Sequence, residues 1–202
     1  MSDFELVVWD FDGVLNANVV KGRFVWADRM KEDLGLDPKA FSSYLFGSGL
    51  MKDVVRGRKN LNDVVGDWLS SQTNAPTADR FLDYWFEQDA RPDLEVIAWM
   101  QKHPGRRVIG TNNEALRAHY IETTMGFADR VEHVFASGRM GVAKPDPGFW
   151  SAVERWAKLR PDQILLVDDN APNIAACQKR GWHGFHFTDD TRGDLPMRLG
   201  IE

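Results

Sequence analysis

Two aspartates, two residues apart, directly follow an apolar segment near the N-terminus. The segment is Leu6–Trp9, and Asp10 and Asp12 come next, in the order Asp10-Phe11-Asp12-Gly13. Burying two like charges at this separation is costly, because each carboxylate loses water and repels the other. A bound divalent cation would offset both effects. The spacing therefore predicts the start of an active site built around a cation.

Further apolar segments predict the strands that must hold these aspartates in place. The best of them are continuously apolar rather than alternating, which is typical of strands buried on both faces of a parallel sheet. The predicted strands are Leu6–Trp9, Arg107–Gly110, His133–Ala136, Ile164–Val167 and the weaker Gly184–Phe187. Helical patterns separate them at Pro92–Lys102, Glu114–Met125, Pro147–Leu159 and Ala171–Lys179. This alternation predicts a three-layer, Rossmann-like α/β core around a parallel sheet.

Residues 16–89 interrupt this alternation of strands and helices. They contain helical patterns but no convincing strand, and the segment is too long for a simple crossover between two strands. The helical patterns cover Val25–Leu34, Pro38–Phe46, Leu61–Ser70 and Ala78–Gln88. We therefore expect residues 16–89 to form an inserted helical cap, and residues 1–15 with 90–202 to form a discontinuous core. Phe46–Gly49 and Arg56–Arg58 are candidates for the substrate entrance.

Polar residues follow the other predicted strands as well. Ligands of open α/β sheets gather at the carboxyl ends of the strands, so these residues are expected to meet Asp10 and Asp12. The additional candidates are Thr111, Asn112, Asn113, Lys144, Asp168, Asp169 and Asn170. Carboxylates suit Mg²⁺, which prefers oxygen ligands, whereas an ammonium, a hydroxyl and amides suit the oxygens of a phosphoryl group.

Four short segments together resemble a known family. They are Asp-Phe-Asp-Gly-Val-Leu at 10–15, Gly-Thr-Asn-Asn at 110–113, Lys144-Pro145, and Val-Asp-Asp-Asn at 167–170. In order and spacing they are similar to the four motifs of the haloacid dehalogenase superfamily, and the similarity covers the core from end to end. The chain most resembles the phosphatase branch with a small helical cap. One such motif would be weak evidence, but four in order after predicted strands are specific.

The resemblance implies a role for each motif residue. Asp10 would be the nucleophile that forms an aspartyl-phosphate, and Asp12 would act as general acid and then general base. Asp12 would also offer its backbone carbonyl to the metal. Thr111 would donate to a phosphoryl oxygen, helped by the backbone or side chain of Asn112. Lys144 would neutralise the phosphate and the carboxylate of Asp10.

The same resemblance implies Mg²⁺ as cofactor, with Asp10, Asp12, Asp168 and Asp169 as candidate ligands. We favour Asp169 as the direct ligand and Asp168 as its support, although the sequence leaves this choice open. Asn173 stands where many members of the family carry an acidic residue, which makes it a candidate for indirect contact with the metal. A second use of Thr111 is also open, because threonine often caps a helix and one is predicted near residue 114.

The expected activity is magnesium-dependent hydrolysis of a small phosphorylated metabolite, such as a sugar phosphate. Three alternatives remain open at this stage. A phosphomutase shares almost all core residues, and a 2-haloacid dehalogenase uses a similar first aspartate without a metal. A catalytically silent binding module could keep the fold alone. Asp12 argues against the dehalogenase, because a halide leaving group needs no proton, and the complete motifs argue against the silent module.

Composition sets the remaining expectations. The 202 residues carry a formal net charge of −5 at pH 7, and no cluster of Lys and Arg predicts a nucleic-acid partner. No apolar segment is long enough to cross a bilayer, and the N-terminus does not resemble a secretory signal. A single cysteine, Cys177, excludes an internal disulfide and fits a reducing compartment. We therefore expect a cytoplasmic protein without a membrane partner, in an oligomeric state that the sequence does not indicate.

Overall fold

A five-stranded parallel sheet lies at the centre of the molecule. The computed structural model describes residues 4–201, and its strands stand in the order β5-β4-β1-β6-β7. The strands are β1 (Leu6–Trp9), β4 (Arg106–Thr111), β5 (Val134–Ala136), β6 (Ile164–Asp168) and β7 (His183–His186). The predicted strands and the predicted α/β class are confirmed. Trp9 pairs with Ile109 on one side and Val167 on the other, so the residues that follow β1, β4 and β6 share one edge.

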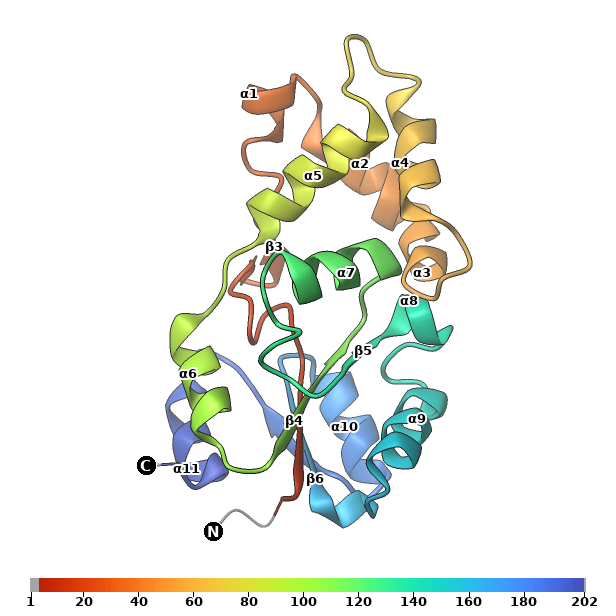
Figure 1. Ribbon diagram of the computed structural model, residues 1–202. Helices are drawn as coiled ribbons and strands as arrows, with labels where there is room; N and C mark the ends of the chain where they lie inside the picture. The colour runs from red at the N-terminus through yellow and green to blue at the C-terminus, as the bar shows by residue number, and fades with distance from the viewer. Residues whose placement is uncertain (1–3, 202) are drawn as a thin grey trace.

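Helices cover both faces of this sheet, which gives three layers. On one face, Val7 and Trp9 pack against α6 (Leu94–Lys102), α7 (Ala115–Thr123) and α11 (Leu195–Leu199). On the other face, Leu6 and Val8 pack against α9 (Pro147–Ala157) and α10 (Ala171–Lys179). All four residues of β1 are buried, which explains why this strand is continuously apolar. In the lower half of Figure 1 the two helical layers flank the sheet.

Between β1 and α6 the chain forms a group of short helices beyond the carboxyl edge of the sheet (Figure 1). They are α1 (Met30–Leu34), α2 (Pro38–Ser42), a π-helical turn over Ser43–Gly47, α3 (Leu50–Val54), α4 (Leu61–Leu69) and α5 (Ala78–Asp89). Their buried apolar residues form a hydrophobic cluster of their own, centred on the rings of Trp26, Phe41, Phe81 and Trp85. The division at residues 15/16 and 89/90 stays a prediction.

The structure corrects two expectations for this segment. A strand was not expected there, yet β2 (Val19–Val20) and β3 (Arg23–Phe24) pair as a short antiparallel hairpin. Its two loop residues, Lys21 and Gly22, both have positive φ angles, 52° and 72°, as two-residue hairpin loops often require. Strands of two residues are too short to show alternation in the sequence. The helix predicted from Val25 begins only at Met30, because turns occupy the residues before it.

Asn16 joins the two connections between the helical segment and the sheet. This fully buried side chain donates from Nδ2 to the Asp89 carbonyl at 2.8 Å and accepts from the Arg91 backbone N–H at 2.7 Å. The Ala17 N–H also donates to the Arg91 carbonyl at 2.7 Å. The two connections therefore run side by side, directly beside the aspartates that follow β1.

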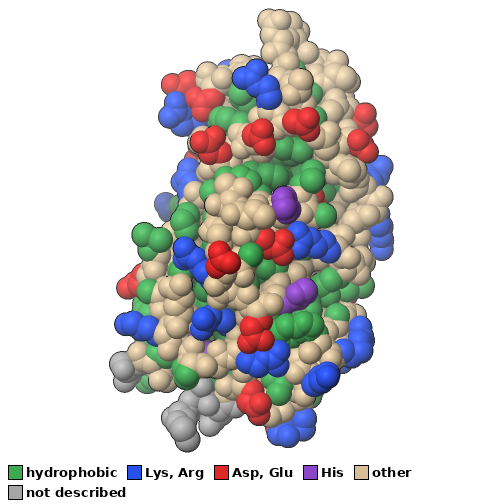
Figure 2. Space-filling view, viewed as in Figure 1, with side chains coloured by type: hydrophobic (Ala, Val, Ile, Leu, Met, Phe, Trp, Pro, Cys, Tyr) green, Lys and Arg blue, Asp and Glu red, His purple; other side chains and the backbone are tan. Residues whose placement is uncertain are grey.

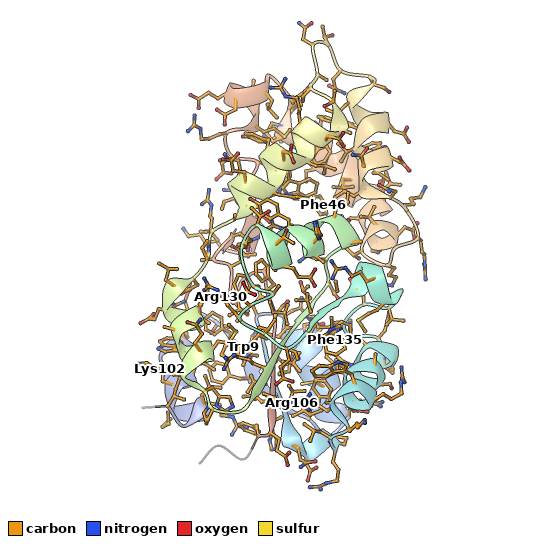
Figure 3. All side chains as sticks on the ribbon, viewed as in Figure 1. Trp9, Phe46, Lys102, Arg106, Arg130 and Phe135 are labelled. Carbon is orange, nitrogen blue, oxygen red and sulfur yellow. The ribbon has the colours of Figure 1, made fainter. Side chains whose placement is uncertain are left out.

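The surface shown in Figure 2 mixes acidic and basic side chains, and the basic ones form no continuous patch on that face. Figure 3 places Trp9 in the sheet half of the molecule and Phe46 in the helical half, close to α7. No helix within residues 4–201 is both long and apolar enough to cross a membrane.

Candidate active site

A buried lysine connects two of the predicted aspartates. The ammonium group of Lys144 lies 2.9 Å from Asp10 Oδ1 and 2.6 Å from Asp168 Oδ2. Lys144 is only 3% exposed and Asp168 is fully buried. Burial alone would lower the pKa of Lys144, but the charges of Asp10 and Asp168 raise it above its usual value. Lys144 is therefore a permanent cation that holds the two carboxylates together.

Asp10 and Asp169 carry charge that Lys144 does not fully balance. Burial, followed by repulsion from Asp168, raises the pKa of Asp10 well above its usual value. The same two causes, in the same order, raise the pKa of Asp169 to about 6. Oxygen atoms of Asp10, Asp168 and Asp169 all lie within 4.8 Å of one another. Three carboxylates this close suit a hard divalent cation such as Mg²⁺.

Backbone geometry brings Asp169 onto the loop that follows β1. Gly13 has a φ of +80°, and a Cβ at this position would overlap the Asp169 carboxylate. Glycine both permits this backbone conformation and leaves room for the carboxylate. Asp168 is held from behind, since Asn173 Nδ2 donates to its two oxygens at 3.0 and 3.1 Å. The structure therefore engages Asp168 with protein groups on several sides, in keeping with the preference for Asp169 as the more available ligand.

Asp12 lies apart from this carboxylate cluster and is surrounded by amides. Its Oδ2 accepts from Asn113 Nδ2 at 2.7 Å, and its Oδ1 accepts from Asn18 Nδ2 at 2.8 Å and from Asn16 Nδ2 at 3.3 Å. These hydrogen bonds fix the direction of the carboxylate. Asp12 thus has a different environment from the carboxylates around Lys144, because its hydrogen-bond donors are amides rather than an ammonium group.

Thr111 and Asn112 end β4 at the same edge. The Thr111 hydroxyl accepts from Asn113 Nδ2 at 2.8 Å, so its own hydrogen remains available to a phosphoryl oxygen. The side chain of Asn112 is engaged elsewhere, because it bonds both the N–H and the carbonyl of Lys144 at 2.8 Å. Of the two options for Asn112, this leaves the backbone for a phosphate and gives the side chain the task of holding Lys144.

The second role considered for Thr111 is wrong. Glu114, not Thr111, caps α7, since its carboxylate accepts from the backbone N–H groups of Leu116 and Arg117. Residues 112 and 113 separate Thr111 from this cap. The Thr111 hydroxyl is therefore not used by the helix.

The predicted residues surround one cavity of about 450 Å³. Eight of the ten candidates named from the sequence line its wall: Asp10, Asp12, Thr111, Asn112, Lys144, Asp169, Asn170 and Asn173. The other two lie next to them, Asp168 bonded to Lys144 and Asn113 bonded to Asp12. We call this space the catalytic cavity. The hairpin of the helical segment also contributes to it, through Val19, Gly22 and Phe24.

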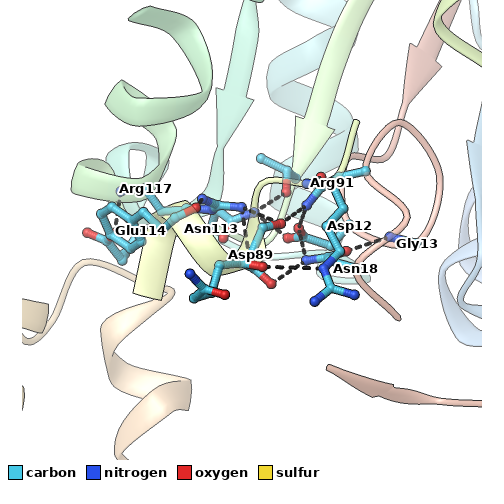
Figure 4. A network of polar contacts seen from close by, with 12 residues as sticks. Asp12, Gly13, Asn18, Asp89, Arg91, Asn113, Glu114 and Arg117 are labelled. Carbon is cyan, nitrogen blue, oxygen red and sulfur yellow. Dashed lines mark hydrogen bonds and ion pairs between the residues drawn. The ribbon is translucent and has the colours of Figure 1, made fainter. Parts of the chain in front are cut away.

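A polar network that the sequence did not indicate connects Asp12 to the helical segment (Figure 4). Asn18 donates to Asp12 and also to Asp89 Oδ1, at 2.8 Å in each case. Asp89 in turn forms a buried ion pair with Arg117 at 2.8 Å. Asp89 lies 71 residues from Asn18 in the sequence, and no local pattern marks either residue, so sequence spacing offered no signal.

Comparison with known proteins identifies the family to which the chain is similar. Residues 4–181 match the haloacid dehalogenase-like hydrolases. The sesquiterpene phosphatase astK of Aspergillus oryzae is 24% identical over 201 residues, which covers 96% of this chain and 95% of that protein.

Two solved structures show the same fold. A predicted hydrolase of the haloacid dehalogenase-like (HAD-like) family from Porphyromonas gingivalis superposes with a TM-score of 0.77 at 16% identity. The match covers 97% of this chain and 98% of that one. A HAD-family enzyme of Bacteroides thetaiotaomicron, in complex with magnesium and inorganic phosphate, superposes with a TM-score of 0.70 at 16% identity. That match covers 92% of this chain and 94% of the other.

The buried Asp89–Arg117 pair predicts a stability effect. Asp89→Ala should lower the free energy of unfolding by about 3–5 kcal/mol, because it leaves a buried guanidinium without its carboxylate. Urea denaturation followed by tryptophan fluorescence measures this. Glu132→Ala removes a partly exposed pair with Arg106 and is the matched control, with an expected loss below about 1 kcal/mol. Equal losses for the two variants would contradict the importance of the buried pair.

The raised pKa of Asp169 predicts pH-dependent binding of Mg²⁺. A carboxylate with a pKa of about 6 is mostly protonated at pH 5, and a proton competes with the metal for its oxygens. The affinity for Mg²⁺ should therefore fall about tenfold or more between pH 7.5 and pH 5. Titration calorimetry at the two pH values measures it, with Asp169→Asn as the variant that should bind weakly at both. An affinity independent of pH would contradict a direct role for Asp169.

Proposed function

The chain belongs to the haloacid dehalogenase-like hydrolases, and from that premise we propose that it is a magnesium-dependent phosphatase acting through an aspartyl-phosphate on Asp10. The substrate is a small phosphorylated metabolite. The observation that carries this proposal is the second carboxylate, Asp12, which three amides hold in the wall of the catalytic cavity that Asp10 also lines. A phosphate ester needs a proton donor for its leaving alcohol, and in this proposal Asp12 is that donor.

The donor set fits Mg²⁺. Asp10, Asp169 and the Asp12 backbone carbonyl would hold it, with Asp168 in support. When bound, Mg²⁺ would neutralise negative charge on the phosphate and on the carboxylates. Lys144 supplies a further positive charge from the protein itself.

In the first step Asp10 attacks phosphorus. The hydrogen bonds that the structure describes for this carboxylate fall on Oδ1, from the Phe11 N–H at 2.7 Å and from Lys144. This leaves Oδ2 as the attacking oxygen. A bond forms between Oδ2 and phosphorus, the bond from phosphorus to the ester oxygen breaks, and Asp12 gives that oxygen its proton. The products are an acyl phosphate on Asp10 and a free alcohol.

In the second step water releases the phosphate. Asp12 is now a carboxylate and takes a proton from a water molecule, whose oxygen attacks phosphorus. The bond from Asp10 to phosphorus breaks, which returns the Asp10 carboxylate and gives inorganic phosphate. Thr111 donates to a phosphoryl oxygen throughout. Asp12 ends the cycle protonated, as it began.

Two further points support this proposal. The relative from Aspergillus oryzae is named a phosphatase, and the related structure from Bacteroides thetaiotaomicron holds magnesium and inorganic phosphate. A haloacid dehalogenase would have no use for Asp12, because a halide leaves without a proton. A phosphomutase would return the phosphoryl group to a second hydroxyl, so release of inorganic phosphate separates it from a phosphatase.

We also infer that residues 16–89 form a cap on a core of residues 1–15 and 90–202. The separate hydrophobic cluster of the helical segment supports this, as do the adjacent connections at Asn16 and Arg91. A cap at this place excludes water from the catalytic cavity when it closes.

The covalent step predicts the effect of removing the nucleophile. Asp10→Asn should abolish release of inorganic phosphate from p-nitrophenyl phosphate, because an amide does not attack phosphorus. A phosphate-release assay with Mg²⁺ measures this. Asp63→Asn, at an exposed position on α4, is the matched control and should keep wild-type rates. Full activity of the Asp10 variant would overturn the covalent mechanism.

Asp12 is proposed both to protonate the leaving alcohol and to activate water, and its removal should therefore affect the two steps of the reaction differently. In Asp12→Asn, steady-state hydrolysis should slow by about 10²–10⁴-fold. With p-nitrophenyl phosphate, however, p-nitrophenolate leaves without a proton, so a burst of nitrophenol equal to the enzyme concentration should precede the slow phase. Stopped-flow absorbance detects the burst. A uniform slowing without a burst would contradict the assignment of Asp12 to water activation.

A further inference from the structure

A second cavity adjoins the catalytic cavity, and its wall is mostly apolar. It has a volume of about 190 Å³ and lies between the helical segment and the start of α7. Aromatic and aliphatic side chains from the helical segment form most of the wall. They include Phe24, Trp26, Phe46, Val55 and Phe86. We call this space the apolar cavity.

The two cavities adjoin each other along a shared part of their walls. Asp12, Phe24 and Asn112 belong to the walls of both. A phosphate that sits near Asp10 and Lys144 therefore has its ester oxygen beside Asp12, at the junction. The remainder of the substrate can extend past Asp12 into the apolar cavity.

Most polar groups in the apolar wall are already engaged, although the buried Nε of Arg117 has no hydrogen-bond partner among the described residues. Asp89 pairs with Arg117, whose guanidinium also donates to the Phe86 carbonyl at 3.1 Å. The rings of Phe86 and Tyr120 lie 5.3 and 5.4 Å from the centre of that guanidinium.

The other four polar residues of the wall are engaged as well. Asn113 donates to Asp12 and Thr111, Glu114 caps α7, and Asn112 holds Lys144. A sugar needs several free hydrogen-bonding partners for its hydroxyl groups, and the one buried donor of this wall that lacks a partner among the described residues, Arg117 Nε, does not supply them all.

Two exposed aromatic rings lie along the same wall. Phe24 is 43% exposed and Phe46 is 42% exposed, although contact between large apolar side chains and water is energetically unfavourable. Both belong to the apolar cavity, and Phe24 also faces the catalytic cavity. An apolar ligand in the cavity would cover part of both rings.

We propose that the apolar cavity binds the hydrocarbon part of the substrate, and that the substrate is the phosphate monoester of an apolar alcohol. This inference rests on the proposed phosphatase activity and replaces the sugar phosphate expected from the sequence. The phosphate enters the catalytic cavity, the ester oxygen lies beside Asp12, and the hydrocarbon chain packs between Phe46, Val55 and Phe86.

A homologous series of alkyl phosphates tests the proposal. With wild-type enzyme and Mg²⁺, kcat/KM for release of inorganic phosphate should rise from ethyl to octyl phosphate, by about fourfold for each methylene that becomes buried. The rise should stop once the apolar cavity is full. Octyl phosphate should be a much better substrate than glucose 6-phosphate.

Three variants test whether the apolar cavity causes this dependence on chain length. Val55→Asp places a charge in the apolar wall and should remove the advantage of octyl over ethyl phosphate. Val20→Asp makes the same change at an exposed position of the hairpin, outside both cavity walls, and should keep the wild-type dependence on chain length. Phe46→Ala, at an exposed ring with little effect on folding, should reduce kcat/KM for octyl phosphate about tenfold.

The outcomes separate the two proposals. Hydrolysis of p-nitrophenyl phosphate together with a flat response to chain length, or a preference for glucose 6-phosphate, would overturn the substrate class and leave the phosphatase standing. The same conclusion follows if Val55→Asp, with a wild-type melting temperature, keeps the preference for octyl phosphate. No release of phosphate from any of these esters would overturn the phosphatase proposal itself, and the substrate class with it.

Discussion

The rest of the site depends on the ion pairs that the buried ammonium group of Lys144 forms with two aspartates. It bridges Asp10 and Asp168 in a place almost closed to water. Without it, two buried carboxylates would face each other, and one of them would be protonated. Two hydrogen bonds between the Asn112 side chain and the backbone of Lys144 fix the position of that lysine. A residue just after β4 therefore positions the ammonium group that pairs with the carboxylates at the ends of β1 and β6. One positive charge does not balance three carboxylates, and the remaining charge makes the site suitable for Mg²⁺.

The same edge of the sheet also links the chemistry to the helical segment. Asn18 contacts both Asp12 and Asp89. Asn16, which lies in one connection to the helical segment, contacts Asp12 and the other connection, at Asp89 and Arg91. A shift of the helical segment would therefore change the surroundings of Asp12, the proposed proton donor. Asp10, which follows β1, and Lys144, in the loop before α9, lie outside that segment. If the helical segment is the cap that we propose, its closure over a substrate would align the proposed acid without disturbing the proposed nucleophile. The apolar cavity lies between the helical segment and the start of α7, so such closure would change its shape.

Much of the fold could be predicted from the sequence, for a physical reason. Strands buried on both faces must be continuously apolar, so Leu6–Trp9 and Ile164–Val167 stood out, and residues after parallel strands must share an edge. The hairpin at Lys21 and Gly22 was missed because two-residue strands carry no periodicity. Asp89 and Arg117 were missed because their partners are distant in sequence. The apolar cavity was not predicted for a similar reason, since Phe46 and Phe86 meet only after folding.

The central claim is that Asp10 receives the phosphoryl group, and rapid-quench mass spectrometry tests it most directly. Asp12→Asn enzyme would be mixed with p-nitrophenyl phosphate and Mg²⁺, quenched in acid, digested and sequenced by fragmentation. The account predicts a single phosphorylated peptide with the phosphoryl group on Asp10, absent when Asp10 is also changed to Asn. Turnover without any phosphorylated peptide, or a phosphoryl group on another residue, would contradict the account.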